Sequence, residues 1–517
     1  MATFALPSVT STSRVLNSNL ASLIMSADEA AALIEFGTRI GMSGFTGSGY
    51  PKAVPLALAR LISDANLRGQ KAQVSIFTGA STGPELDGAL AKAGGIQLRL
   101  PYQSDPETRK RINAGEMEYM DIHLGHVAQY VENGFLGKMD WAIIEVTAIL
   151  EDGRLVPSSS VGNNRTWIEQ AEKVIIEVNA RQPAELEGMH DIYYGMQPPP
   201  NRQPIPLVHP GQRIGTPYLH VPLEKVAAVV LTDSPDRNSP FKAPDISSRQ
   251  IAGHILEFLG WEVKKGRIPA SLLPLQSGVG NIANAVLFGL LEEARFEDLT
   301  AYTEVIQDGM IELLRSGKLT CASATAFSLS PDMLEKVNSE MANYRERIVL
   351  RPQEISNHPE IIRRLGVIGM NGMIEADIYG NVNSTHVMGS RIQNGIGGSG
   401  DFARNGYLAI FMAPSTAQKG DISTIVPMVS HVDHTEHDVD VVVTEQGLAD
   451  LRGLSPRQRA KVIIENCAHP NYRSLLLDYQ GRAERLSFGK HTPHLLRESL
   501  SWHERYVRSG RMLPGED

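Results

Sequence analysis

The sequence predicts an α/β fold with mostly parallel sheets covered by helices, divided into two domains. Short runs rich in Val and Ile alternate with helical patterns along the whole chain, which is typical of α/β architecture. Most of these runs are continuously apolar, as expected for strands with helices on both faces. The stretch Ser234–Asp245 is rich in turn formers and predicts a linker. We therefore predict domains at residues 1–240 and 241–517.

In the first half, the strand candidates are short and rich in β-branched residues. A helix is expected over Ala27–Glu35, opened by Ser26, and another over Val54–Asn66. Prolines between Gln197 and Pro217 predict an extended connection instead of an element. The expected strands are Arg39–Met42, Val74–Thr78, Trp141–Val146, Val174–Val178 and Val226–Thr232.

The second half also alternates apolar strand candidates with helical patterns, although its residues do not repeat those of the first half. A helix is expected from Ser247, as its N-cap, to about Phe258. The expected strands are Thr300–Thr303, Thr320–Ala324, Tyr407–Met412, Thr424–Val429 and Val439–Val443.

The composition excludes several classes of protein. The chain has 517 residues, 42% of them hydrophobic, and a net charge of -9, which argues against a nucleic-acid partner. It contains no apolar run of about 18 residues, so no membrane partner is expected. Its two cysteines, Cys321 and Cys467, stand far apart and form no disulfide framework. A reducing compartment, and hence a cytoplasmic location, is predicted.

The stretch Gln276–Ala294 carries a glycine pattern that predicts anion binding. Gly278 and Gly280 permit a tight turn, and the helix expected after them would direct free N–H groups at an anion. The spacing Gly278-x-Gly280-x-x-Ala283 also fits a dinucleotide fingerprint. Glu304, at the end of the next expected strand, stands roughly where that fold has its ribose-binding acid. These residues alone leave an NAD-dependent dehydrogenase open.

Other motifs have competing interpretations. After Gly395–Phe402 no helix is expected, so this loop is either a wide turn or a set of backbone donors for an oxyanion. Gly41–Pro55 predicts a glycine-requiring turn more than a phosphate site, because it lacks the Gly-Lys-[Ser/Thr] ending. His431, His434 and His437 are three residues apart, but the acids between them favour a hydrated loop over a metal site.

Long motifs follow one another in a fixed order: GMSGFTGSGYPK, DRNSPF, LQSGVGNIANAV, AYTEVIQDGM, SNHPEIIRRLG, NVNSTHVMGSRIQNGIGGSGDFARN and VVTEQGLADLRG. In these motifs, from about Gly41 to Arg485, the chain resembles the acetyl-CoA hydrolase/transferase family, and within it the bacterial CoA-transferases. The resemblance implies two similar CoA-transferase-like α/β domains and a homodimer.

The resemblance also implies the site residues. Glu304, in the Tyr-Thr-Glu-Val motif, matches the nucleophile, and Gly398 matches an oxyanion-hole amide. Arg237 is suited to the free carboxylate of a diacid, and Ser81 is a weaker match. Asn357 and Glu445 match further active-site positions. The implied CoA-binding residues are Gln276, Ser277, Gly278, Val279, Gly280, Asn281, Asn394, Gly398 and Lys419.

The implied activity is CoA transfer between short-chain carboxylic acids, with succinyl-CoA and acetate as the expected pair. It would proceed through an acyl-glutamyl anhydride and a glutamyl-CoA thioester at Glu304. Such chemistry needs no metal and no permanently bound cofactor, because coenzyme A and acyl-CoA are the substrates. An acetyl-CoA hydrolase and the dehydrogenase remain as alternatives.

Overall fold

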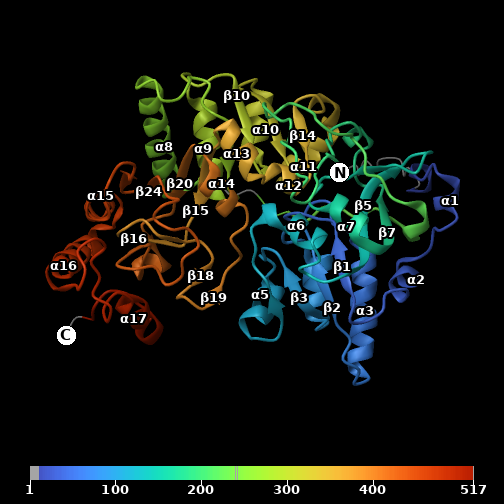
Figure 1. The fold of residues 1–517 in the computed structure, drawn as a ribbon, viewed down its shortest axis with the longest axis horizontal. Helices are drawn as coiled ribbons and strands as arrows, with labels where there is room; N and C mark the ends of the chain where they lie inside the picture. Colours follow the sequence, from blue (N-terminus) through green and yellow to red (C-terminus); the bar gives the residue numbers. More distant parts are fainter. Residues whose placement is uncertain (1–10, 239, 241–242, 516–517) are drawn as a thin grey trace, which may run out of the picture. The chain divides into compact units, whose positions relative to one another are not determined.

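The computed structural model describes residues 11–238, 240 and 243–515. The chain packs into two compact units, each of α/β architecture (Figure 1). The predicted fold class, with mostly parallel sheets flanked by helices, is confirmed. One unit contains Met1–Leu207, Gly211–Pro240 and Ser323–Ser356, and the other contains Val208–Pro210, Phe241–Ala322 and Asn357–Asp517.

The division into domains at 1–240 and 241–517 stays a prediction. Packing groups the chain differently in one respect, because Ser323–Ser356 lies in the first unit although it follows the segment Phe241–Ala322 of the second. Packing divides the chain within the predicted linker Ser234–Asp245, of which residues 239, 241 and 242 lie outside the described part. Asp236, within that stretch, is buried in the first unit and forms a 2.9 Å ion pair with Lys52.

The first unit is built on one sheet with the strand order β4-β3-β2-β1-β5-β7-β8, and β6 pairs with β5. All pairs along this order are parallel, whereas β6 is antiparallel. The predicted strands of the first half coincide with β1, β2, β5, β7 and β8, with small differences at the ends. The bounds are β1 (Arg39–Met42), β2 (Val74–Phe77), β3 (Ile96–Leu100), β4 (Glu118–Tyr119), β5 (Met139–Ile149), β6 (Leu155–Pro157), β7 (Ala171–Asn179) and β8 (Val226–Thr232).

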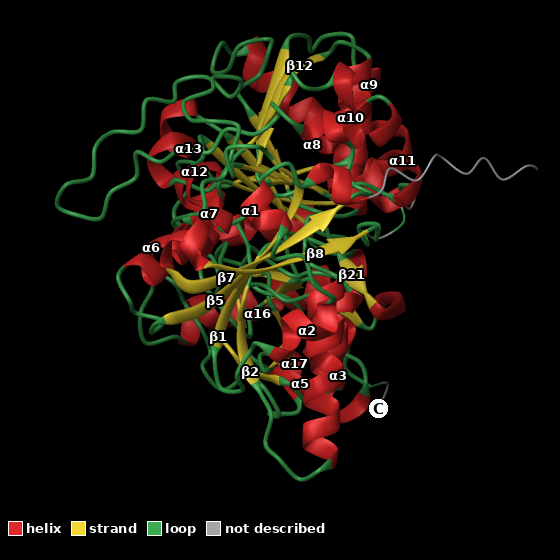
Figure 2. Ribbon diagram, turned by 90° about the vertical axis from the view of Figure 1, so that its right-hand side faces the viewer, coloured by secondary structure: helices red, strands yellow, loops and turns green. Residues whose placement is uncertain are grey.

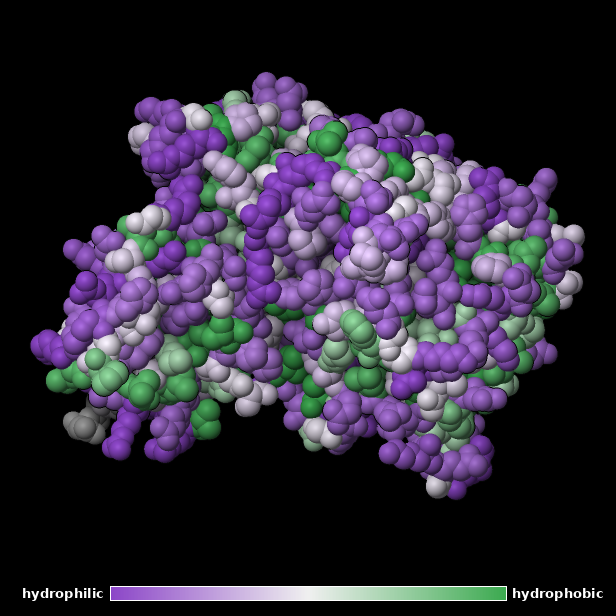
Figure 3. Space-filling view, in the orientation of Figure 1, coloured by the Kyte–Doolittle hydropathy of each residue, from purple (hydrophilic) through white to green (hydrophobic). Residues whose placement is uncertain are grey.

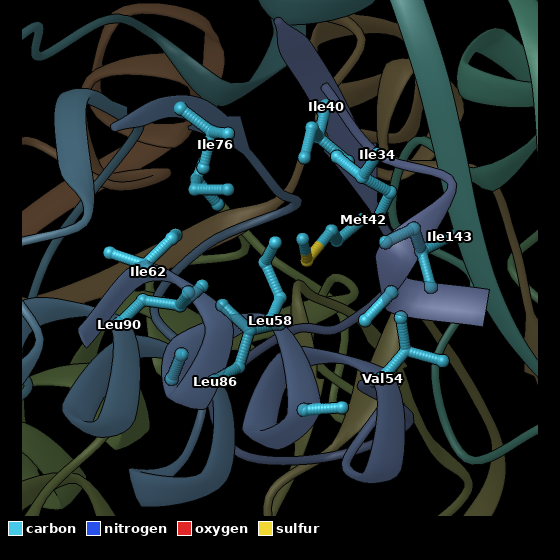
Figure 4. Close-up of a cluster of buried hydrophobic side chains, with 14 of the residues drawn as sticks. Ile34, Ile40, Met42, Val54, Leu58, Ile62, Ile76, Leu86, Leu90 and Ile143 are labelled. Atoms are coloured by element: carbon cyan, nitrogen blue, oxygen red, sulfur yellow. The ribbon is translucent and has the colours of Figure 1, made fainter. Parts of the chain in front are cut away.

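Helices cover this sheet on both faces, which explains its continuously apolar strands. The helices α2 (Ala27–Ala32) and α3 (Ala53–Leu67) lie side by side (Figure 2). The side chains of Val54, Leu58 and Ile62 on α3 lie in one buried cluster with residues of β1, β2 and β5 (Figure 4). The helix α7 (Asn164–Gln170) contacts the sheet as well, with Trp167 over Gly41, where a Cβ atom would lie 2.7 Å from the indole ring. Ser26 caps α2 as predicted, in a capping box with Glu29.

The other elements of the first unit are short. They are η1 (Ser11–Arg14), α1 (Ser18–Ala21), η2 (Pro84–Gly88), α4 (Ala89–Lys92), α5 (Pro106–Asn113), η3 (Leu124–His126), α6 (Val127–Glu132), η4 (Ala184–Leu186), η5 (Leu223–Lys225), β13 (Ala326–Phe327), α11 (Pro331–Ser339), η6 (Met341–Asn343), β14 (Ile348–Leu350) and α12 (Gln353–Ser356).

The sheet of the second unit has the order β12-β10-β9-β15-β20-β24-β25. From β10 to β24 the neighbours are parallel, and β25 is antiparallel to β24. Only Ile425–Val426 of the predicted strand Thr424–Val429 is a strand. The bounds are β9 (Leu275–Ser277), β10 (Leu299–Tyr302), β12 (Leu319–Ala324), β15 (Ile368–Gly372), β20 (Leu408–Met412), β24 (Val441–Thr444) and β25 (Gly447–Asp450).

The two sheets share one topology that the residues do not reveal. In the order β3-β2-β1-β5-β7-β8, each strand has a counterpart in β12-β10-β9-β15-β20-β24. The second strand of each series is followed directly by a threonine, Thr78 in the first unit and Thr303 in the second. The next residue differs, since Gly79 stands where the second unit has Glu304.

The helices of the second unit include one whose cap was predicted wrongly. Asp245, not Ser247, caps α8 (Ile246–Lys264), because its carboxylate accepts a 2.7 Å hydrogen bond from the N–H of Ser248. The other elements are α9 (Asn281–Glu292), β11 (Val305–Ile306), α10 (Asp308–Arg315), α13 (Pro359–Leu365), β16 (Glu375–Asp377), β17 (Val382–Asn383), β18 (His386–Val387), β19 (Arg391–Ile392), α14 (Ser399–Asn405), β21 (Thr416–Ala417), η7 (Gln418–Gly420), β22 (Ile422–Ser423), β23 (Ile425–Val426), α15 (Pro456–Cys467), α16 (Pro470–Leu486) and α17 (Ser501–Ser509).

The surface seen in Figure 3 is mostly hydrophilic, with scattered apolar patches. Among the described residues, no helix has the length and apolar character that crossing a membrane requires.

Candidate active site

The carboxylate of Glu304 lies at the end of the second unit's strand β10 and receives two hydrogen bonds. Asn357 Nδ2 donates to its Oε1 over 3.3 Å, and the backbone N–H of Gly398 donates a second bond. Glu304 follows Thr303 directly after the strand, at the sheet edge where open α/β sheets place their sites. The structure thus brings together three of the predicted residues, which are 41 to 94 positions apart in the sequence.

Burial changes the acidity of this carboxyl group. It raises the pKa of Glu304 to about 7, although the hydrogen bonds from Asn357 and Gly398 favour the ionised form. Glu304 therefore carries a carboxylate that is incompletely ionised near neutral pH and poorly solvated. Perturbed carboxyl groups of this kind cluster at functional sites.

Gly398 packs directly against the nucleophile candidate. A Cβ atom at this position would lie 2.1 Å from Glu304 Oε1, so a side chain cannot be accommodated without moving the carboxylate. Gly398 is also the N-cap of α14, and this corrects the expectation that no helix follows Gly395–Phe402. The helix has seven residues and includes Gly400, so it is too short and too weakly helix-forming to show a periodic pattern.

The predicted CoA-binding loop connects β9 with α9, and the helix expected after it is confirmed. Gly280 has φ of +137°, a conformation that favours glycine, and Val279 is 62% exposed at the tip. The side chain of Gln307 braces the loop by donating to the carbonyl of Gly278 over 2.9 Å. Sequence reasoning missed Gln307, although it stands only three residues after Glu304.

The helices α9 and α3 each follow a glycine loop, but only α3 has a carboxylate bound to the N–H groups of its first turn. In α9, no side chain caps the first turn and no acid lies in it. In α3, which follows the Gly41–Pro55 loop, Glu177 accepts hydrogen bonds from the N–H groups of Lys52 (2.6 Å) and Val54 (3.0 Å). An internal carboxylate thus fills the place of a phosphate at α3, in agreement with the structural interpretation of that loop.

The remaining predicted CoA-binding residues have distinct surroundings. Gln276 is buried, and its side-chain amide both donates to and accepts from the amide of Asn371 (3.0 and 3.2 Å). Its side chain therefore supports the loop and is not free to contact a ligand through these atoms. Asn394 is half-buried between β19 and α14. Lys419 is exposed and has φ of +59°, next to Gln418 with φ of +50°. Left-handed backbone at two consecutive non-glycine residues is strained and concentrates at functional loops.

Glu445, which follows β24, is held by a short polar network. Its Oε2 accepts from the N–H of Ser415 over 2.7 Å, and its Oε1 accepts from Gln446 Nε2 over 2.9 Å. Burial raises the pKa of Glu445, but these bonds outweigh that effect and hold the pKa below its usual value. Ser415, which also donates its hydroxyl to Glu445, has no signal in the sequence.

Arg237 and Ser81 belong to the first unit, so the structure does not group them with Glu304 in one unit. Arg237 Nε donates to Glu85 Oε1 over 3.0 Å, and the Arg237 side chain is 54% exposed. Glu85 also accepts from the hydroxyl of Tyr50 over 2.6 Å. Ser81 donates to Gln103 over 2.9 Å.

The three histidines of the acidic stretch point to different partners. His431 lies 3.2 Å from Asp433, His434 is buried beside Ser384 and Ser399, and His437 is 80% exposed. Over residues 11–238, 240 and 243–515, no group of three or more His, Cys, Asp or Glu is placed to hold a metal ion.

Comparison with known proteins gives concordant results. The profile of the acetyl-CoA hydrolase/transferase N-terminal domain matches residues 10–231, and that of the C-terminal domain matches residues 335–480. A succinyl-CoA:acetate CoA-transferase of Clostridium kluyveri is 53% identical over 96% of this chain and 92% of its own. An acetyl-CoA hydrolase of Saccharomyces cerevisiae is 46% identical over 95% of each chain. The structure of a 4-hydroxybutyrate CoA-transferase from Porphyromonas gingivalis superposes with a TM-score of 0.61, at 21% identity, over 89% of this chain and 98% of that one.

Proposed function

Because the chain belongs to the acetyl-CoA hydrolase/transferase family, we propose that it moves CoA between short-chain carboxylic acids with Glu304 as the covalent nucleophile. The observation that carries this proposal is the contact of the Glu304 carboxylate with two hydrogen-bond donors, Asn357 Nδ2 and the Gly398 N–H.

The proposed reaction conserves the energy of the thioester. Glu304 attacks the acyl carbonyl carbon, the C–S bond breaks, and a mixed anhydride and CoA thiolate result. The thiolate then attacks the glutamyl carbon, the donor acid leaves as a carboxylate, and Glu304 becomes a CoA thioester. The acceptor acid reverses these steps. One thioester is made for each one broken, so no oxidant or reductant is consumed.

We infer that two donors stabilise charge during these steps. When thiolate or acceptor acid attacks the glutamyl carbon, negative charge develops on a glutamyl oxygen. Asn357 Nδ2 and the Gly398 N–H already contact the oxygens of Glu304 and would meet that charge without rearrangement. Removing one donor of this kind typically raises a barrier by about 3 kcal/mol.

We propose that CoA binds along the loop Gln276–Asn281 and the start of α9. The first N–H groups of α9 have no side-chain cap, so they can donate to an anionic or polar part of CoA. Lys419, exposed on a strained loop, would contribute a positive charge to CoA binding. Asn394, between β19 and α14, is proposed to contact CoA as well.

Succinyl-CoA and acetate are the proposed pair of substrates. Because Glu85 engages Arg237 through Nε, both Nη groups remain to hold the second carboxylate of succinate. The name of the Clostridium kluyveri relative, at 53% identity, supports this pair. The two domains at 1–240 and 241–517, a homodimer and a cytoplasmic location are proposed with it.

A hydrolase is the second candidate, because the Saccharomyces cerevisiae relative carries that name at 46% identity. The two activities differ in the final acceptor, which is a carboxylic acid in the transferase and water in the hydrolase. The test is to follow succinyl-CoA with and without acetate while recording free thiol. We expect acetyl-CoA to form only with acetate and little free thiol to appear. Equal thiol release in both samples would favour the hydrolase. The dehydrogenase that the glycine spacing left open has no support from the family match.

A further inference from the structure

The amide of Asn357 lies between two carboxylates. Its Nδ2 atom is 3.3 Å from Glu304 Oε1 and 3.2 Å from Asp401 Oδ2. Each of the two hydrogens on Nδ2 therefore has its own acceptor. Asn357 is fully buried and Asp401 is 3% exposed, so water competes little for these bonds.

From this geometry we propose that Asp401 is a positioning residue that fixes the orientation of the Asn357 amide toward Glu304. The NH₂ and carbonyl ends of an asparagine side chain have nearly the same size, so packing alone does not choose between them. A second carboxylate in contact with Nδ2 does, because it binds the NH₂ group and repels the carbonyl oxygen.

The need for Asp401 arises during the reaction, and this step rests on the proposed function. In the free enzyme, the Glu304 carboxylate itself attracts the NH₂ group. In the anhydride and thioester, Glu304 has lost its negative charge, so its hold on the amide weakens. Asp401 is not consumed and keeps the N–H directed at the glutamyl oxygen when the next attack makes it negative.

Asp401 and Gly398 belong to the same end of one helix. Asp401 lies in the first turn of α14, and Gly398 is the N-cap of the same helix. One helical turn thus supplies the backbone N–H that meets Glu304 and the carboxylate that orients the second donor.

A double-mutant cycle tests whether Asp401 acts through Asn357. The variants are Asp401→Ala, Asn357→Ala and the double substitution, assayed for CoA transfer. We expect Asp401→Ala to lower kcat about 10- to 100-fold, in the range for groups that orient a functional side chain, with a smaller change in KM. In the Asn357→Ala background the same substitution should cost no more than about twofold. An equal loss in both backgrounds would overturn the proposal.

Controls separate positioning from stability. Asp401→Asn keeps an acceptor oxygen and should retain most of the activity. Asp377→Asn changes another buried acid of the same unit, which serves Tyr379 N–H and Asn381, and should lower Tm while leaving kcat unchanged. If Asp401→Ala does not fold, Asp401→Leu, which keeps the branch at Cγ but has no acceptor, completes the cycle. Covalent labelling of wild-type Glu304 is a separate readout: if it fails, the proposed function fails, and if it succeeds while the cycle is additive, only the role of Asp401 is wrong.

Discussion

Gly398 lies so close to Glu304 that a Cβ atom on the glycine would stand 2.1 Å from Oε1 and 2.5 Å from Oε2 of the carboxylate. The absent side chain lets a backbone N–H reach the carboxylate directly. In the first unit the corresponding strand end has Gly79, and a Cβ there would lie 2.8 Å from the carbonyl oxygen of Gly44. The shared topology therefore has room for a reactive carboxylate at only one of these two strand ends.

Substitution of Gly398 by alanine should displace the Glu304 carboxylate. We expect Gly398→Ala to lower kcat/KM about 100-fold or more, since a misplacement of about 1 Å costs this much. Steady-state transfer rates measure the effect. Gly253→Ala in α8, where a Cβ meets nothing within 4 Å, is the control and should keep full activity. Wild-type rates in Gly398→Ala would contradict the assigned geometry.

The pH dependence of transfer should report the ionisation of Glu304. Because the carboxylate is the nucleophile and its pKa is about 7, kcat/KM for the acyl-CoA should rise with pH and level off above that value. Asn357→Ala removes a bond that favours the ionised form, so the rise should move to higher pH. Asn383→Ala, which removes a 2.9 Å bond to the buried Glu375, should leave the profile unchanged. A shift of the Asn357→Ala profile to lower pH would argue against this assignment.

Neutralising Glu304 should stabilise the fold at alkaline pH. The pKa of Glu304 is raised from 4.5 to about 7, so the folded state binds more protons than the unfolded state between these values. Stability is therefore lost as pH rises, and Glu304→Gln should gain about 1–3 kcal/mol above pH 7 and nothing below about pH 4. Thermal unfolding of both proteins across pH measures this difference. A Glu304→Gln variant less stable than wild type at pH 8 would contradict the assigned cost of burial.

Arg237 should matter for the diacid and little for the monoacid. Loss of a charge-assisted hydrogen bond costs about 1.5–3 kcal/mol, so Arg237→Ala should lower kcat/KM for succinyl-CoA about 10- to 100-fold. The value for acetyl-CoA should change little. Arg60→Ala removes another exposed arginine of the first unit, paired with Asp28, and should affect neither substrate. Equal losses with both thioesters would show that Arg237 does not recognise the second carboxylate.

Much of the fold could be predicted because most strands are short apolar runs, many of them rich in Val and Ile. β1 and β8 have the bounds that these runs indicate, and Glu304 lies at a strand end as expected. What could not be predicted depends on long-range packing. The return of Ser323–Ser356 to the first unit leaves no local signal, and neither does the shared topology of the two sheets, whose residues have diverged.

Long-range packing also limits how much of the candidate site the sequence could predict. Motifs indicated Glu304, Asn357 and Gly398, but their contacts join residues far apart in the sequence. The helix after Gly398 was missed because its seven residues include a glycine. Asp401 and Gln307, which hold the amide and the loop, carry no motif signal that separates them from ordinary polar residues.

The central claim is that Glu304 becomes covalently linked to CoA, and borohydride trapping tests it most directly. The wild-type protein is incubated with succinyl-CoA in the absence of an acceptor acid, treated with borohydride and analysed by peptide mass spectrometry. We predict that the peptide containing Glu304 carries an alcohol in place of the carboxylate, and that Glu304→Gln carries none. An unmodified Glu304 in protein that is actively transferring CoA would contradict the proposed mechanism.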